Sequence, residues 1–260
     1  MRISRLGLGL CFGLAASIIF AQPPSPQDAQ PEAVQPEAWQ IVVLANQARA
    51  MAGTAPLKWD PALGEAARQH CVRMAAEGPI SHRYGGEPDL TSRAGQAGAH
   101  FSVIEENVAI GPTPAAIHDE WMHSPGHRTN LMSPDVDRVG VAVVSSRGVL
   151  YAVADYARAV QVLTPVQVEA AIANLLRVSG ITILNDPTAA RAYCADNKGA
   201  KSGNQPGFRM LWQGTDLTHL PQPLVDHLGS GQYHQAAVGN CPAQNVEGQF
   251  TAYRVAVLLY

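Results

Sequence analysis

The sequence predicts an α+β protein, because strong helix signals and separate strand hairpins occur in the same chain. Four helix starts are marked by a capping side chain followed by proline, at Asp60-Pro61, Thr113-Pro114, Thr164-Pro165 and Asp186-Pro187. Strand signals follow the second of these starts. Valines alternate with smaller residues over 139–143, and residues 149–156 return after a short turn, which predicts a β-hairpin.

Composition limits the classes of function. Of the 260 residues, 47% are hydrophobic, which is enough for a substantial core, and only 15% are charged. The 18 Lys and Arg residues against 21 Asp and Glu residues leave a net charge of −3. Proteins that bind nucleic acid or anionic membranes gain their affinity from clustered cations. We therefore exclude nucleic acid as a partner.

The first 21 residues have the pattern of a secretory signal peptide. Arg2 and Arg5 precede an apolar stretch from Leu6 to Phe20, and the small residue Ala21 follows. The stretch is shorter than the roughly 20 residues that span a bilayer, and an uncleaved anchor is the weaker alternative. We expect a secreted protein, extracellular or periplasmic, with no membrane span after removal of the signal.

A tether is expected to follow, because residues 22–38 contain five prolines and four glutamines and no large apolar cluster. The first folded unit is predicted over 39–157. Its expected elements are a helix from Trp39 to Gly53, a helix from Asp60 to Gly78, a long loop over 79–113, a short helix ended by Pro125-Gly126, and the hairpin.

A second α+β unit is predicted over 158–260. Its expected elements are a helix opened by a capping box at Thr164, a helix from Asp186-Pro187, a strand over 208–213, a short helix over 224–228, and strands over 235–241 and 250–259. The last hairpin is similar to that of residues 138–153, which suggests that the second unit extends the first sheet. Two unrelated hairpins are the alternative.

Export changes the interpretation of the cysteines, because thiols in oxidising compartments usually form disulfides. Three cysteines remain without the signal segment. Cys71 falls on a predicted buried helix face, so we expect a Cys194–Cys241 bridge and a free, buried Cys71. Three free thiols are the alternative.

The residues that carry chemistry are His82, Glu106 and His127, which lie far apart in sequence in segments of low regularity. Two imidazoles and a carboxylate are the ligand set of an open zinc site. A set of cavity residues with no metal is the alternative, and spacing alone does not decide between them.

Several segments together resemble the CAP superfamily, which groups cysteine-rich secretory proteins, antigen 5 and pathogenesis-related 1 proteins with bacterial SCP-like secreted domains. The resemblance covers about residues 39–157. It rests on five segments: Leu57-Lys58-Trp59-Asp60, Ile80-Ser81-His82, Glu106-Asn107-Val108-Ala109, Trp121 to Leu131, and Val139-Gly140-Val141.

The resemblance implies a three-layer α-β-α sandwich with a cleft lined by two histidines and two glutamates. His82, Glu106 and His127 match three of these four residues, and Asn107 lies beside them. Ser124 stands where the second glutamate is expected, which makes the site less anionic. A weakly bound Zn²⁺ at His82 and His127 is the cofactor that the resemblance suggests.

We expect a non-catalytic binding module that takes a small hydrophobic ligand, a glycan or an envelope or extracellular protein. The alternative is a metal-dependent hydrolase or protease in which Glu106 is the catalytic base toward a zinc-bound water. Whether the protein is an enzyme is left open, and the missing second glutamate favours binding.

Overall fold

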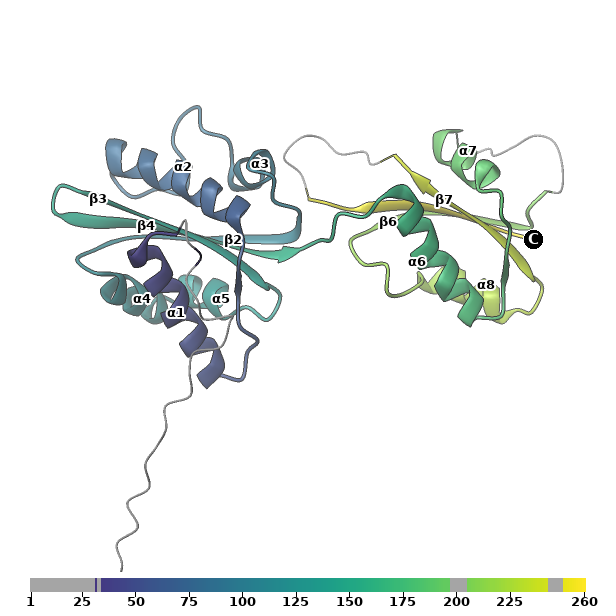
Figure 1. Cartoon of the computed structure of the whole chain (residues 1–260), viewed down its shortest axis with the longest axis horizontal. Helices are drawn as coiled ribbons and strands as arrows, with labels where there is room; N and C mark the ends of the chain where they lie inside the picture. Colours follow the sequence, from purple (N-terminus) through teal and green to yellow (C-terminus); the bar gives the residue numbers. More distant parts are fainter. Residues whose placement is uncertain (1–30, 32–33, 197–204, 243–249) are drawn as a thin grey trace, which may run out of the picture.

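The computed structural model describes residue 31 and residues 34–196, 205–242 and 250–260. The expected signal peptide and most of the expected tether lie outside these residues. The described chain forms two units, each with a four-stranded sheet between helices (Figure 1). Both units mix helices and strands, so the predicted α+β class is confirmed.

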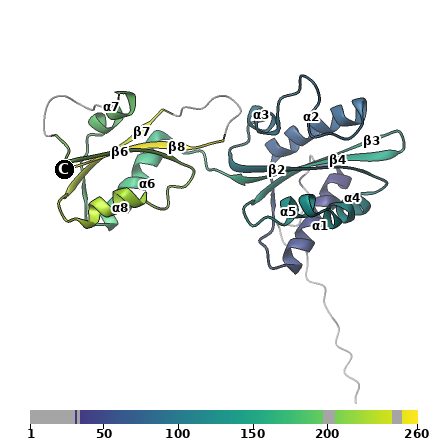
Figure 2. The ribbon, with the colours of Figure 1, turned by 180° about the vertical axis from the view of Figure 1, so that it is seen from behind.

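The first unit is a three-layer sandwich, as predicted. Its helices are α1 (Pro36–Met51), α2 (Pro61–Glu77), α3 (Leu90–Gln96), α4 (Pro114–His123) and α5 (Pro125–Met132). Its strands are β1 (Lys58–Trp59), β2 (Phe101–Gly111), β3 (Arg138–Ser146) and β4 (Val149–Ala159), in the order β1-β3-β4-β2. Helices α2 and α3 cover one face of the sheet, and α1, α4 and α5 cover the other (Figures 1 and 2).

The helix starts follow the capping signals of the sequence. The Asp60 side chain accepts hydrogen bonds from the backbone amides of Ala62 and Leu63, and Thr113 caps α4 in the same way. Helix α1 begins at Pro36, earlier than the expected Trp39, because proline fits the first turn of a helix, where its missing N–H costs nothing. The expected tether therefore ends sooner than residue 38.

Two expectations for residues 79–132 were wrong. The predicted loop over 79–113 contains helix α3 and the eleven-residue strand β2, which pairs with β4 along most of its length. Tertiary pairing with β4 outweighs the polar composition of this segment. Pro125-Gly126 does not simply end a helix. Pro125 stands at the first position of α5, and Ser124 between the two helices has extended backbone geometry.

Three residues that pair across neighbouring strands show which face of the first sheet carries Glu106. Glu106 on β2 pairs with Asp155 on β4, and Asp155 pairs with Gly140 on β3. Side chains of directly paired residues lie on one face, here the face covered by α2. A Cβ at Gly140 would lie 2.0 Å from the amide nitrogen of Gly64, so glycine allows α2 to pack directly on the strand.

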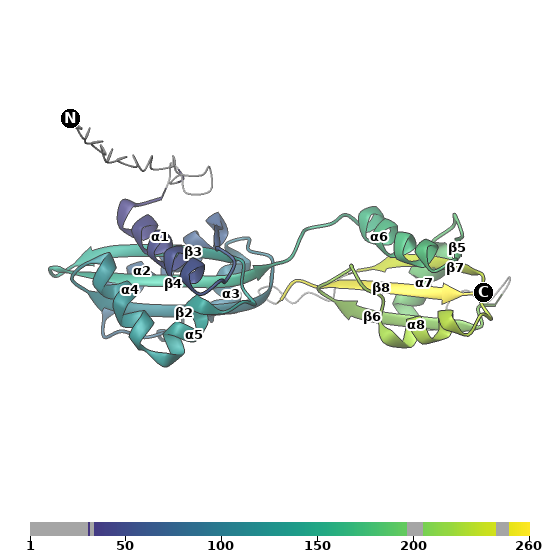
Figure 3. The same ribbon diagram turned by 90° about the horizontal axis from the view of Figure 1, so that it is seen from below.

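The second unit has its own sheet and does not extend the first. Its helices are α6 (Pro165–Val178), α7 (Thr188–Asp196) and α8 (Gln222–Gly229). Its strands are β5 (Thr182–Ile183), β6 (Phe208–Gly214), β7 (Gln235–Cys241) and β8 (Tyr253–Leu259), in the order β5-β7-β8-β6. Figure 3 shows the two sheets joined by the segment between β4 and α6. The expectation of one continuous sheet is corrected.

The cysteines behave as predicted. Cys194 on α7 and Cys241 on β7 form a disulfide across 47 residues of sequence. Cys71 is a free, buried thiol, and burial raises its pKa to about 12. Among the described residues, no helix is both long and apolar enough to cross a membrane.

Candidate functional site

The site is organised around the buried carboxylate of Glu106, on edge strand β2. Its Oε1 atom lies 2.8 Å from Nδ1 of His82, and its Oε2 atom accepts a hydrogen bond from Nη2 of Arg93 on α3. The Glu106 and Arg93 side chains are 4% and 2% exposed, whereas the His82 side chain is 60% exposed. A histidine, a glutamate and an arginine therefore form one continuous row from the surface to the interior.

The segment that carries His82 is held from beneath by a second buried pair. Nδ1 of His70 on α2 lies 2.8 Å from the Glu87 carboxylate, and Nε2 lies 2.8 Å from the backbone oxygen of Ser81. The Glu87 carboxylate also accepts a hydrogen bond from the amide of Tyr84. These contacts hold both ends of the turn around His82.

Electrostatics favour a charged His82. Its hydrogen bond to Glu106 raises its pKa above the ordinary value, although burial and the charge of Arg93 act in the opposite direction. Because an ionised carboxylate only accepts hydrogen bonds, Nδ1 of His82 carries the proton and donates it. Nε2 is then the atom of this ring that is free to interact with a ligand.

His127 reaches the site from α5, through a polar link to β2. The Asn107 side chain donates a hydrogen bond of 2.9 Å to the backbone oxygen of His127, and Asn130 donates to Asn107 at 3.0 Å. Burial lowers the pKa of His127, and the nearby charge of His82 lowers it further. Asn107 is itself fully buried, so its place in the site is to position α5 rather than to bind a ligand.

A further carboxyl group, Asp155, lies directly across from Glu106. It is fully buried, and neither of its oxygens makes a hydrogen bond of normal geometry with the described residues. Burial, and then the neighbouring Glu106 carboxylate, raise its pKa well above the ordinary value. Burial and the neighbouring negative charge therefore favour the protonated form of Asp155.

The arrangement fits a metal ion poorly. Ser124 occupies the position of the second glutamate, and it lies in the extended link between α4 and α5. Within the described ranges, no three His, Cys, Asp or Glu side chains are placed to hold a metal together. His82 and His127 are the two expected ligands, and the carboxylate oxygens of Glu106 already have partners.

Sequence reasoning identified His82, Glu106, Asn107 and His127 as neighbours, and the structure brings them together. It missed Arg93 and Asp155. Arg93 lies in a segment of small polar residues that was interpreted as loop, and Asp155 lies in an otherwise apolar strand. A charged residue within an otherwise apolar strand indicates a functional or tightly packed position, because burying a charged side chain without a partner costs free energy.

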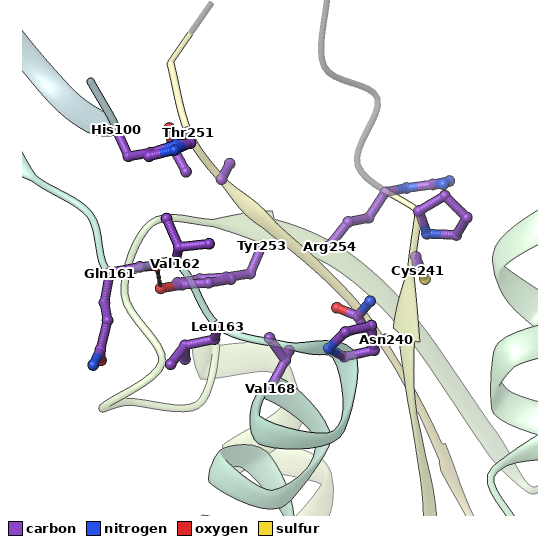
Figure 4. A pocket seen from close by; sticks show the side chains of 13 residues that line it. His100, Gln161, Val162, Leu163, Val168, Asn240, Cys241, Thr251, Tyr253 and Arg254 are labelled. Carbon is purple, nitrogen blue, oxygen red and sulfur yellow. Dashed lines mark hydrogen bonds between the residues drawn. The ribbon is translucent and has the colours of Figure 1, made fainter. Parts of the chain in front are cut away.

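A pocket of about 340 Å³ lies elsewhere, where the linker meets the second unit. Its lining includes Val162 and Leu163 from the linker, Val168 on α6 and Asn240 on β7, with His100 from the first unit (Figure 4). The hydroxyl group of Tyr253 donates a hydrogen bond to the backbone oxygen of Gln161 beside it. None of the predicted cleft residues lines this pocket, although Cys241 of the disulfide does.

The sandwich and the histidine–glutamate pair at its edge strand define a CAP-type domain. Residues 43–156 match the model of the CAP family, described as the cysteine-rich secretory protein family. This part of the chain is a CAP domain, as the resemblance implied.

Two curated relatives come from Bacillus subtilis (strain 168). Uncharacterized protein YkwD is 31% identical over 120 residues, which are 45% of this chain and 46% of that protein. Uncharacterized membrane protein YlbC is 33% identical over an alignment of 128 residues, and the match covers 44% of this chain and 36% of that protein. The chain thus spans less than half the length of either relative.

Solved structures with a similar fold include an outer surface protein from Borrelia burgdorferi. It has 18% identity and a TM-score of 0.44, and the match covers 46% of this chain and 90% of that one. An extracellular protein of Bacillus anthracis that contains an SCP domain has 25% identity and a TM-score of 0.44, with 47% of this chain and 40% of that one covered.

Proposed function

We propose that the chain is an exported binding protein whose CAP domain holds its ligand at His82 and His127 and catalyses no reaction. The observation that supports this proposal is that both carboxylate oxygens of Glu106 are engaged in hydrogen bonds, one with His82 and one with Arg93. A general base must lie within reach of the proton that it removes. The Glu106 side chain is only 4% exposed and both of its oxygens face these partners, so it is a positioning residue.

The exposed groups indicate the chemistry of the ligand. The His82 side chain is 60% exposed and presents Nε2 to solvent. His127, which is half-buried and whose pKa is lowered by burial, lies nearby, and the exposed Arg128 follows it on α5. Hydrogen-bonding groups of this kind favour a glycan or a protein surface over a wholly apolar lipid.

A hydrolase is the second candidate, and one observation favours it. A histidine whose Nδ1–H is held by a buried carboxylate is the base–orienter pair of many hydrolases. In such an enzyme His82, and not Glu106, would be the base. Among the described residues, however, no serine, threonine or cysteine side chain is hydrogen-bonded to His82, so the pair lacks a nucleophile to activate.

An assay of the full chain separates the two candidates. We expect no turnover of casein or of a nitrophenyl ester, and we expect binding on a glycan array that the double variant His82→Ala/His127→Ala loses. His123→Ala is the matched control, because His123 is exposed on α4. Turnover that disappears with His82→Ala and persists with His123→Ala would establish a hydrolase and overturn the proposal.

A further inference from the structure

The charge partner of Glu106 is an arginine of the same chain. Arg93 and Glu106 are both almost fully buried, and the guanidinium group donates directly to the carboxylate. A buried carboxylate is costly unless it is neutralised, and metal ions or cationic side chains can supply the neutralising charge. In this chain the side chain of Arg93 already supplies it.

Arg93 also links separate segments of the chain, as a bound metal ion would do by coordination. Its Nη1 atom lies 3.4 Å from the backbone oxygen of His82 and 3.4 Å from that of Pro88. The guanidinium group thus joins helix α3, the turn that carries His82 and strand β2. Together with the His70–Glu87 pair beneath the same turn, it holds His82 in place without any coordination bond.

From these contacts we infer that Arg93 takes the place of a divalent cation, and that the site of this CAP domain excludes metal and works without it. A metal ion next to Glu106 would have to displace a buried guanidinium group or lie beside its positive charge. The other expected oxygen donor is missing, because Ser124 replaces the second glutamate. Two imidazoles then remain, with the charge of Glu120 close enough to act on His127. Among the described residues no three His, Cys, Asp or Glu side chains are placed to hold a metal together, whereas an open zinc site usually has three protein ligands.

The inference rests on the proposed binding function and deepens it, because it removes the metal-activated water that a metal-dependent hydrolase would use. The test is calorimetric titration of the full chain with Zn²⁺, together with the imidazole NMR signals of His82 and His127. We expect the wild-type protein to show no uptake that depends on these two histidines, and their signals to stay unshifted.

Arg93→Met is the informative variant. Removing the cation leaves the Glu106 carboxylate free to act as a ligand, so we expect stoichiometric Zn²⁺ uptake where the wild type shows none, with the NMR signals of His82 and His127 shifted. Arg93→Lys keeps the positive charge and should keep the metal out. Arg177→Met, on the exposed side of α6, is the matched control and should leave Zn²⁺ uptake unchanged.

Stoichiometric Zn²⁺ uptake by the wild type, lost in His82→Ala/His127→Ala and retained in His123→Ala, would overturn the inference. This outcome is read from the wild-type protein, one site variant and its control, so it decides the question even if Arg93→Met does not fold. It also differs from a failure of the proposed function, because zinc binding without turnover would leave a binding protein.

Discussion

At the scale of single residues, Asp155 has an environment that is rare for a carboxyl group. It is a fully buried acid with no hydrogen-bond partner of normal geometry among the described residues, across the strand from Glu106. The sequence predicts a strand at this position, but it does not reveal which residue of another strand lies opposite. Long-range pairing creates the environment of Asp155, and this is why sequence reasoning missed it.

Asp155→Asn should stabilise the protein in a pH-dependent way. An unfolded aspartate ionises near pH ~3.9, whereas burial raises the pKa of Asp155 in the folded state. Between the two pKa values the folded state retains a proton that the unfolded state has lost, so the free energy of unfolding falls as pH rises. The variant lacks this penalty. Relative to the wild type it should gain up to about 1.4 kcal/mol per pH unit across that window.

Urea unfolding at a series of pH values, followed by circular dichroism, measures this difference. Asp119→Asn is the control, because Asp119 is exposed on α4 and its replacement should change stability little at any pH. A stability difference between Asp155→Asn and the wild type that does not grow as pH rises above about 4 would show that Asp155 is ionised in the folded protein.

At the scale of elements, the sequence predicts the helices whose starts depend on neighbouring residues, but it does not predict a strand that is stabilised by distant contacts. Helices α2, α4 and α6 begin where a capping residue precedes proline, because the cap and the fixed φ of proline act within one turn. Strand β2 was missed, because Glu105-Glu106 interrupts its apolar pattern and its stability comes from pairing with β4. The missed strand is the one that carries the site.

Helices pack directly against strand glycines at two places, and replacing these glycines should lower stability. A Cβ at Gly140 would lie 2.0 Å from Gly64 of α2, and one at Gly239 would lie 2.5 Å from Arg191 of α7. Gly140→Ala and Gly239→Ala should therefore each destabilise their own unit by roughly 1–3 kcal/mol, because backbone atoms must shift. Thermal unfolding measures the loss. Gly126→Ala is the control, since a Cβ there would meet no atom within 4 Å, and unchanged stability in both core variants would contradict the packing.

At the scale of the whole molecule, the two units share one architecture. Within each unit, the first strand pairs in parallel with the third. The third strand pairs with the fourth, and the fourth pairs with the second, both in antiparallel orientation. Each also has one helix face that packs against a strand glycine, at Gly140 and Gly239. The similarity of the two hairpins in the sequence reflects this shared topology and not a continuous sheet.

The second unit does not repeat the site. The positions on β6 and β8 that pair in the middle of its sheet are apolar, such as Leu211 with Ala256. The row of histidine, glutamate and arginine is thus confined to the first unit among the residues that the structure describes. The sequence could predict this row only in part, because Arg93 approaches Glu106 through the packing of α3 on β2 and not through spacing along the chain.

In the proposed site, Arg93 and not a metal neutralises Glu106 and holds the turn of His82. The decisive measurement is a crystal structure of the full chain soaked in Zn²⁺, with anomalous scattering recorded at the zinc edge. The Arg93 guanidinium group should remain on Glu106, with no anomalous peak between His82 and His127. A peak between these two histidines, with Glu106 turned toward it and away from Arg93, would show that a metal completes the site instead.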